Sequence, residues 1–207
     1  MQPPGHRAPP PVRWGEPPPS FLTRLLGRLR ALVGSTPRDS RTALRPLPVA
    51  LRRSELAVPY LAADAKGDNP QAAAAALTAM RQAVQDGNWW PADIWGHRAL
   101  WHYERAGMGL EATRAARVIG DLRWAAGDPA SSRRYYAEAI SEARDLGAEQ
   151  EEGLAALGMG RAALDLSDVT TARRLGAIAL DLLERADAPA DELAAARELR
   201  GQEKPVR

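Results

Sequence analysis

Two histidines lie close together in the sequence, but their spacing does not suit a metal site. His97 and His102 are five residues apart, whereas two ligands on one face of a helix are four apart, and no third ligand is nearby in the sequence. Asp93 and Glu104 could be added as an acid and a base, yet nothing in their spacing selects them. We therefore expect no catalytic residues, no metal and no cofactor.

The composition removes other kinds of chemistry. The chain has 207 residues and no cysteine, which excludes disulfides, thiolate nucleophiles, Cys-ligated zinc and iron–sulfur clusters. There is no P-loop. Gly153, Gly158 and Gly160 fall within an Ala- and Leu-rich helical run, where close helix packing explains them better than nucleotide binding. We expect a protein that is not an enzyme.

Charge and proline divide the chain into two parts. The net charge is +2, but the first 60 residues hold ten arginines against three acidic residues, which is +7, so the remainder carries −5. Twelve of the 17 prolines precede Tyr60. We predict a tail and connector over 1–64, a helical domain over 65–201 and a short tail over 202–207.

The apolar residues are too scattered for a membrane protein. No stretch approaches the roughly 18 apolar residues of a spanning helix. Arginines also interrupt the apolar core that a secretory signal would need near the N-terminus. We therefore expect a cytoplasmic protein.

One amphipathic helix is predicted within the basic tail, over residues 20–34. It combines apolar residues at helical spacing with bordering arginines, as in Phe21, Arg24, Leu25, Arg28 and Leu29. A free helix of about fourteen residues is marginal in water, so it needs a surface to lie on. An anionic membrane, a groove in a partner and the acidic domain of this chain remain open, as do nucleic-acid phosphates contacted by residues 20–53.

After residue 64 the prolines are sparse and stand where helices begin, as expected for a first-turn position. Short turn-forming breaks separate seven expected helices, at about 70–86, 91–106, 110–126, 129–146, 149–166, 169–186 and 190–201. No segment has the pattern of a strand. Short connections between helices of similar length imply antiparallel neighbours, and hence an all-α fold of stacked helical hairpins.

A pattern of small residues recurs after forty positions. The first copy contains Gly120, Gly127-Asp128, Tyr136, Ala139 and Ile140, and the second contains Gly160, Ser167-Asp168, Ala172, Ala179 and Leu180. Small residues let paired helices approach closely, while the Gly/Ser-Asp pair forms the turn between them. The pattern resembles the tetratricopeptide repeat over about residues 113–186.

That resemblance implies a right-handed superhelix of helical hairpins, with a plain helical bundle as the alternative. It also implies that the first helix of each repeat lines a concave groove for an extended peptide or a helix. The matching positions are Arg114, Arg117, Asp121, Trp124 and Ala125, then Leu154, Leu157, Arg161, Leu164 and Asp165. At the position of Tyr136, the second copy has Gly176 where the family has a bulky residue.

Arginines around Trp124 would favour an acidic or C-terminal carboxylate ligand, because guanidinium groups bind carboxylates bidentately. The alternative is that these arginines are solvated and Trp124 belongs to the core. Trp89, Trp90 and Trp101 present a similar choice. They could form an aromatic binding patch, or they could supply core volume to an Ala-rich protein.

The sequence thus predicts a non-enzymatic adaptor or scaffold. It would bind a peptide or helix of a partner protein in the groove, with the basic N-terminal helix as a second contact. The alternative is a regulatory protein attached to nucleic acid or to an anionic membrane surface through its basic N-terminal segment.

Overall fold

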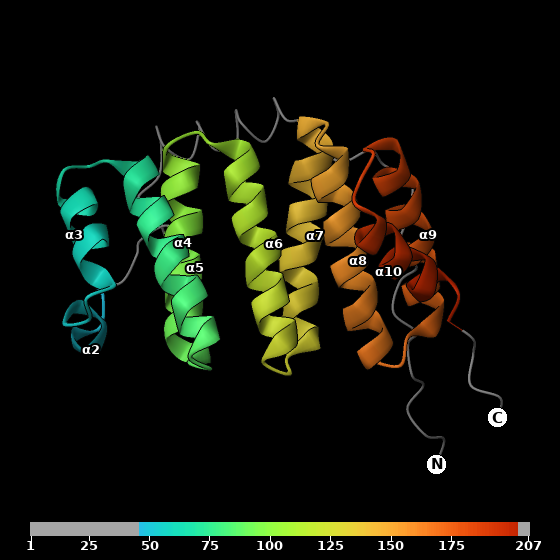
Figure 1. Ribbon diagram of the computed structural model, residues 1–207, viewed down its shortest axis with the longest axis horizontal. Coiled ribbons are helices and arrows are strands. Elements are labelled where there is room, and N and C mark those ends of the chain that lie inside the picture. Colours follow the sequence, from blue (N-terminus) through green and yellow to red (C-terminus); the bar gives the residue numbers. More distant parts are fainter. Residues whose placement is uncertain (1–45, 203–207) are drawn as a thin grey trace, which may run out of the picture. The chain divides into compact units, whose positions relative to one another are not determined.

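The computed structural model describes residues 46–202, which belong to the compact unit Ser40–Arg207. The amphipathic helix expected over 20–34 lies outside these residues. The described part is all-α, without a strand, and Figure 1 shows its helices side by side. The helices are α2 (Val49–Arg52), α3 (Ala57–Ala65), α4 (Asn69–Gln85), α5 (Trp89–Arg105), α6 (Gly109–Ala125), α7 (Pro129–Leu146), α8 (Glu149–Asp165), α9 (Val169–Arg185) and α10 (Ala190–Arg200).

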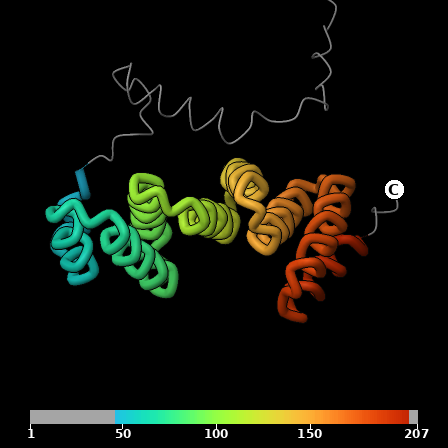
Figure 2. The backbone as a smooth tube through the Cα atoms, turned by 90° about the horizontal axis from the view of Figure 1, so that it is seen from above, coloured from blue at the N-terminus to red at the C-terminus, as the bar shows by residue number. Residues whose placement is uncertain are grey.

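The expected stack of helical hairpins is confirmed. Each helix from α2 to α9 packs on the next in the chain, and the most extensive contacts are those of α4 with α5, α6 with α7, and α8 with α9. Figure 2 shows this succession with the helices seen nearly end-on. In addition, α6 contacts α8 and α8 contacts α10, so successive hairpins are joined through their first helices. All seven helices predicted from the sequence are present, with ends within about two residues of the expected ones.

A residue in the left-handed conformation ends each helix from α3 to α9, and these residues follow one another at intervals of twenty. They are Gly67, Gly87, Gly107, Gly127, Gly147, Ser167 and Asp187, with φ between 51° and 81°. After α6, the N–H of Gly127 donates to the carbonyl of Trp124 and that of Asp128 to the carbonyl of Arg123, the pair of bonds that defines a Schellman motif. The forty-residue repeat is therefore two of these twenty-residue units.

Aspartates restart three of the helices directly after these turns. Asp68, Asp128 and Asp168 each accept a hydrogen bond from a backbone N–H three residues later, at 3.0 to 3.1 Å. Such a cap satisfies an N–H that has no partner within the helix. The Gly/Ser-Asp pairs therefore form both the end of one helix and the start of the next.

Tyr136 shows why the first repeat needs its glycines. Its ring is fully buried between Gly120 on α6 and Gly158 on α8. A β-carbon at Gly120 would lie 2.8 Å from the ring, and one at Gly158 would overlap it. This is the close approach that the pattern of small residues predicts.

The glycine at 176, where the family has a bulky residue, has a different neighbour. A β-carbon at Gly176 would lie 2.6 Å from the backbone nitrogen of Arg200. The backbone of α10 therefore occupies the space that a large side chain would take in a further repeat.

The start of the domain differs from the expected boundary. Helix α3 crosses residue 64, and its residues Tyr60 and Ala63 are buried against the rest of the fold. Pro59 is the third residue of this nine-residue helix. In the first turn a proline removes no intrahelical hydrogen bond.

We expect Gly158→Ala to destabilise the protein by about 1–3 kcal/mol, because the added methyl group overlaps the buried ring of Tyr136 and the core must shift. Urea unfolding measures the change. Gly109→Ala is the control, because its β-carbon would meet only the methyl groups of Leu146 at 3.5 Å, an ordinary contact distance. Equal stability of the two variants would contradict the packing described.

Replacing Ser167 by glycine should stabilise the protein by up to about 1 kcal/mol. Ser167 has φ 63°, a conformation that is unfavourable for residues with a β-carbon and free for glycine. Thermal unfolding would show a raised Tm. The control is Ala177→Gly, at an exposed position inside α9, which should lower the stability by about 1 kcal/mol. A lowered Tm for Ser167→Gly would contradict the left-handed turn.

Candidate functional site

Of the ten groove positions predicted from the sequence, the five charged residues and Trp124 lie on α6 and α8 and contact residues of the other or the same helix. Arg114 and Arg117 both bind the carboxylate of Glu151, with their Nε atoms 2.8 and 3.0 Å from its two oxygens. Glu151 is buried, in the first turn of α8. Because a buried carboxylate is costly without partners, this pairing ties α6 to α8. We call the seven residues Arg114, Arg117, Asp121, Trp124, Glu151, Arg161 and Asp165 the α6–α8 face.

Asp121 extends this network toward the core. It accepts a hydrogen bond from Arg117 at 3.0 Å and another from the hydroxyl of Tyr136 at 2.7 Å. Burial of the phenol and the adjacent Asp121 carboxylate raise the pKa of Tyr136 well above its usual value. Tyr136 therefore acts as a neutral donor that holds Asp121 in place.

Trp124 occupies the end of the face nearest the α6–α7 turn. Its Nε1 donates to the carboxylate of Asp165 at 2.6 Å, across the two helices. The guanidinium of Arg161 lies 6.0 Å from the centre of the Trp124 ring. Trp124 is half-buried, so it is neither wholly in the core nor free of neighbours.

The charges on this face are balanced within it. Three arginines stand beside three carboxylates, those of Asp121, Glu151 and Asp165. The sequence suggested a positive groove, but Glu151 was not among the predicted residues and it binds two of the arginines. Glu151 follows Arg114 by 37 residues and Arg117 by 34, separations close to the repeat length of forty. That spacing was the only signal in the sequence that could have placed Glu151 on this face.

The predicted aromatic patch is divided between the two ends of α5. Trp89 and Trp90 lie at its start and are 39% and 59% exposed. Trp101 follows Trp90 by eleven residues, which is about 17 Å along a helix. It packs edge-on against His102, and the guanidinium of Arg105 lies 4.7 Å from the centre of its ring. The three tryptophans therefore do not form a single patch.

A buried polar cluster joins α3, α4 and α5. His102, 1% exposed, has its Nδ1 2.9 Å from the amide oxygen of Asn69 and its Nε2 3.2 Å from the hydroxyl of Tyr60. An amide oxygen only accepts, so Nδ1 carries the proton and Nε2 accepts from Tyr60. The Tyr60 oxygen in turn accepts from Arg98 at 2.8 Å. A neutral imidazole satisfies all of these donors and acceptors.

Burial lowers the pKa of His102, and the positive charges of Arg98 and Arg105 lower it further, while Asp64 opposes them. Asp64 lies 3.6 Å from Nε2 and is 46% exposed on its side chain. Solvent screens its charge, so it offsets the burial only in part. The cluster holds α3 in place rather than forming a site open to a ligand.

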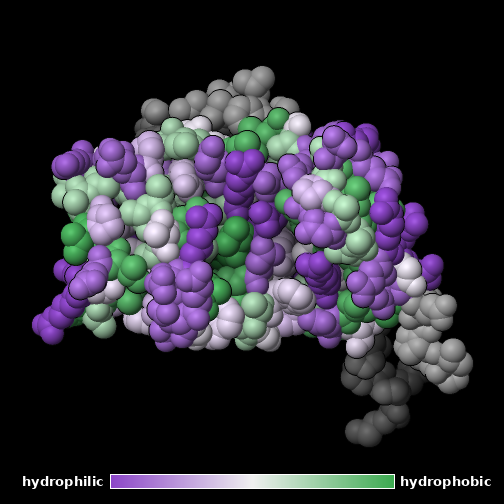
Figure 3. Space-filling model, in the orientation of Figure 1, coloured by the Kyte–Doolittle hydropathy of each residue, from purple (hydrophilic) through white to green (hydrophobic). Residues whose placement is uncertain are grey.

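No helix within residues 46–202 is long and apolar enough to cross a membrane. Figure 3 shows hydrophilic residues spread over the face it presents, with smaller hydrophobic areas between them. Over the same range, no group of three or more His, Asp or Glu residues is placed to hold a metal ion.

No family model matches the chain, and no curated protein matches its sequence. The likeness to tetratricopeptide repeats therefore rests on the residues of the forty-residue pattern and on the stacked hairpins.

We expect the stability of the protein to fall as the pH drops below about 6.5, the ordinary pKa of an unfolded histidine. The folded state lowers the pKa of His102, so between the two values the unfolded chain binds the additional proton and protonation favours unfolding. Urea unfolding at pH 7.5 and 5.5 measures the difference. His102→Gln should be less stable at pH 7.5 and less sensitive to this pH change. An unchanged pH dependence in the variant would contradict the assignment.

Proposed function

We propose that this protein is an adaptor or scaffold of the tetratricopeptide-repeat type, without catalytic activity. Its α6–α8 face would bind a peptide or a helix of a partner protein. The observation that carries the proposal is that residues at the family's groove positions form two groups of contacts between successive first helices. Arg114 and Arg117 on α6 share Glu151 on α8, and Trp124 on α6 contacts Arg161 and Asp165 on α8. Stacked hairpins with a forty-residue period support it further.

The contacts on the face suggest the chemistry of the ligand. Arg114 and Asp121 are about half exposed on their side chains, and Arg161 and Asp165 are exposed. The face therefore offers donors and acceptors in similar number, beside the half-buried ring of Trp124. That mixture suits the backbone and polar side chains of an extended peptide better than a strongly acidic segment, which would have to displace the internal carboxylates.

The alternative function, attachment to nucleic acid or an anionic membrane through the basic N-terminal segment, depends on residues 20–53. Most of these lie outside the described residues, and this function stays a prediction.

Affinity capture with the full chain tests the proposal. The double variant Trp124→Ala and Arg161→Ala removes the ring and the exposed guanidinium beside it without changing Glu151, and we expect recovery of the captured partner to fall at least tenfold. The double variant Arg185→Ala and Arg197→Ala is the control, because it removes two exposed, ion-paired arginines elsewhere on α9 and α10. Equal recovery with both variants would refute the α6–α8 face as the binding surface.

A deletion of residues 1–45 separates the two functions. It leaves every described residue in place, so partner recovery should persist if the α6–α8 face binds. Complete loss of binding on deletion, together with no effect of the Trp124 and Arg161 changes, would favour the N-terminal segment.

A further inference from the structure

The first two helices of the described chain keep the register of the helices that follow them. From α4 to α9, each helix begins twenty residues after the one before it, at residues 69, 89, 109, 129, 149 and 169. Helix α2 begins at Val49 and α3 ends at Ala65, so together they fill the preceding interval, with a break at residues 53–56. Residues 49–65 are therefore equivalent to α5, α7 and α9, the second helices of the three hairpins.

In a complete hairpin, one face of the second helix lies against the first helix. A β-carbon at Gly160 on α8 would meet Leu175 and Ala172 of α9, and one at Gly153 would meet Leu182. All three of these α9 residues are buried. Their positions mark the face through which a second helix packs on its own first helix.

The same face is exposed on residues 49–65. The residues 120 positions before the three buried residues of α9 are Arg52, Glu55 and Ala62, and all three are exposed. Pro59 is exposed as well. The three hairpins have a fully buried alanine at its position: Ala99, Ala139 and Ala179. A helical surface that the repeat normally buries is thus open here.

This open surface includes large apolar side chains. Val58 is 63% exposed and lies one helical turn before Ala62, and Val49, at the start of α2, is 62% exposed. These are the two most exposed large hydrophobic residues of the described part of the chain. We call Arg52, Glu55, Val58, Pro59 and Ala62 the α2–α3 face.

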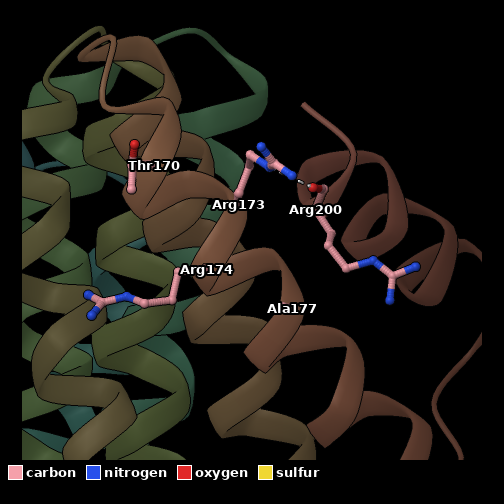
Figure 4. Close-up of a pocket in the computed structure, with 5 residues that line it drawn as sticks. All are labelled: Thr170, Arg173, Arg174, Ala177 and Arg200. Carbon is pink, nitrogen blue, oxygen red and sulfur yellow. Dashed lines mark hydrogen bonds between the residues drawn. The ribbon is translucent and has the colours of Figure 1, made fainter. Parts of the chain in front are cut away.

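The opposite end of the stack is closed by a polar helix. Figure 1 shows α2 and α3 at one end of the row of helices and α10 beside α9 at the other. Figure 4 shows Arg173 of α9 reaching toward α10, where its Nε donates to the backbone oxygen of Arg200 at 3.4 Å. No residue of α10 is among the exposed large hydrophobic residues of the described part. A polar outer face is usual for the last helix of a repeat stack, and the α2–α3 face does not follow this rule.

The charges around the α2–α3 face are complementary to themselves. Residues 52–55 include two arginines and one glutamate, and residues 64–68 include two aspartates and one lysine, so the two ends carry +1 and −1. A two-fold axis near Val58, the middle of the 49–65 interval, would place the positive end of one copy beside the negative end of another. The two copies would then pack antiparallel, as neighbouring helices do within the stack.

We propose that the α2–α3 face binds the same face of a second copy of this chain. Each copy then occupies, on the other, the position that a first helix has in a complete hairpin. A symmetric dimer requires a surface that is complementary to itself, and the opposite charges at the two ends of the interval meet that requirement. The exposed valines lie between them, where the two copies meet.

A dimer of this form would present two α6–α8 faces, one on each copy. Two sites bind a partner that carries two matching segments more tightly than one site does, because the second binding event is intramolecular. This consequence rests on the proposed function, whereas the dimer itself does not.

Sedimentation velocity with the full chain tests the dimer. We expect the mass to rise with concentration toward that of two chains, with a dissociation constant in the micromolar range, because one helical segment from each copy makes a small interface. Val58→Glu should raise this constant at least tenfold, since it brings two carboxylates together at the axis. Ile178→Glu is the control. Ile178 is exposed at the equivalent position of α9, 120 residues later, and its change should alter the constant less than twofold.

Single cysteines test the antiparallel arrangement, because the chain has none of its own. Under mild oxidation, Val58→Cys should form a disulfide-linked dimer, since the two copies of this position lie at the axis. Val49→Cys is the control on the same exposed surface. It lies nine residues from Val58, about 13 Å along a helix, so its two copies are too far apart for a disulfide.

Three results would overturn the proposal: a full chain that stays monomeric at about 200 μM, a Val58→Glu variant that associates as well as Ile178→Glu, or equal disulfide formation by Val49→Cys and Val58→Cys. If the chain is monomeric and Val58→Glu lowers its Tm, residues 1–45 rather than a second copy cover the face. Circular dichroism checks that the variants remain folded. Because the α2–α3 face and the α6–α8 face share no residue, failure here leaves the proposed function intact.

Discussion

The left-handed residue that ends every helix from α3 to α9 sets the geometry on which the rest of the described fold depends. Its spacing of twenty residues gives these helices from α4 onward nearly equal length, 17 or 18 residues. Because neighbouring helices are antiparallel and equally long, every hairpin begins and ends at the same end of the stack. Equivalent positions of successive hairpins therefore lie next to one another. Contacts between residues about forty apart, such as Trp124 with Asp165, follow directly from this register.

Small residues allow the helices aligned in this way to pack closely. Alanines such as Ala72, Ala92, Ala139 and Ala172 are fully buried, and the glycines around Tyr136 allow one large ring to contact two helices. With so little side-chain volume, specific polar contacts take a large part in defining which helices meet. Glu151 between two arginines joins α6 to α8, and His102 between Tyr60 and Asn69 joins α3 and α4 to α5.

The same polar contacts change how the charged residues should be understood. On the α6–α8 face the arginines lie beside carboxylates of their own and of the neighbouring repeat, so the face is mixed in charge. On α9 and α10, Arg185 and Arg197 are likewise paired with carboxylates.

The helices of this chain are encoded locally. Gly at the left-handed position, Asp at the cap and Pro in the first turn act on neighbours within five residues, so the sequence alone is sufficient to predict seven helices, their antiparallel order and the forty-residue period. Helix α3 was missed because the proline-rich composition around it suggested a connector, although Pro59 lies in the first turn and Tyr60 is buried by helices that follow.

The surroundings of the charged residues, by contrast, depend on which side chains the stacking brings together. The partners of Arg114, Arg117 and Trp124 lie 34 to 41 residues away, and a sequence pattern does not show whether a distant carboxylate will be buried beside an arginine or exposed apart from it. The separation of Trp101 from Trp89 and Trp90 and the neutralisation of the α6–α8 face arise in the same way. They result from the packing of one helix against another, where burial and distance set how strongly each charge interacts with its neighbours.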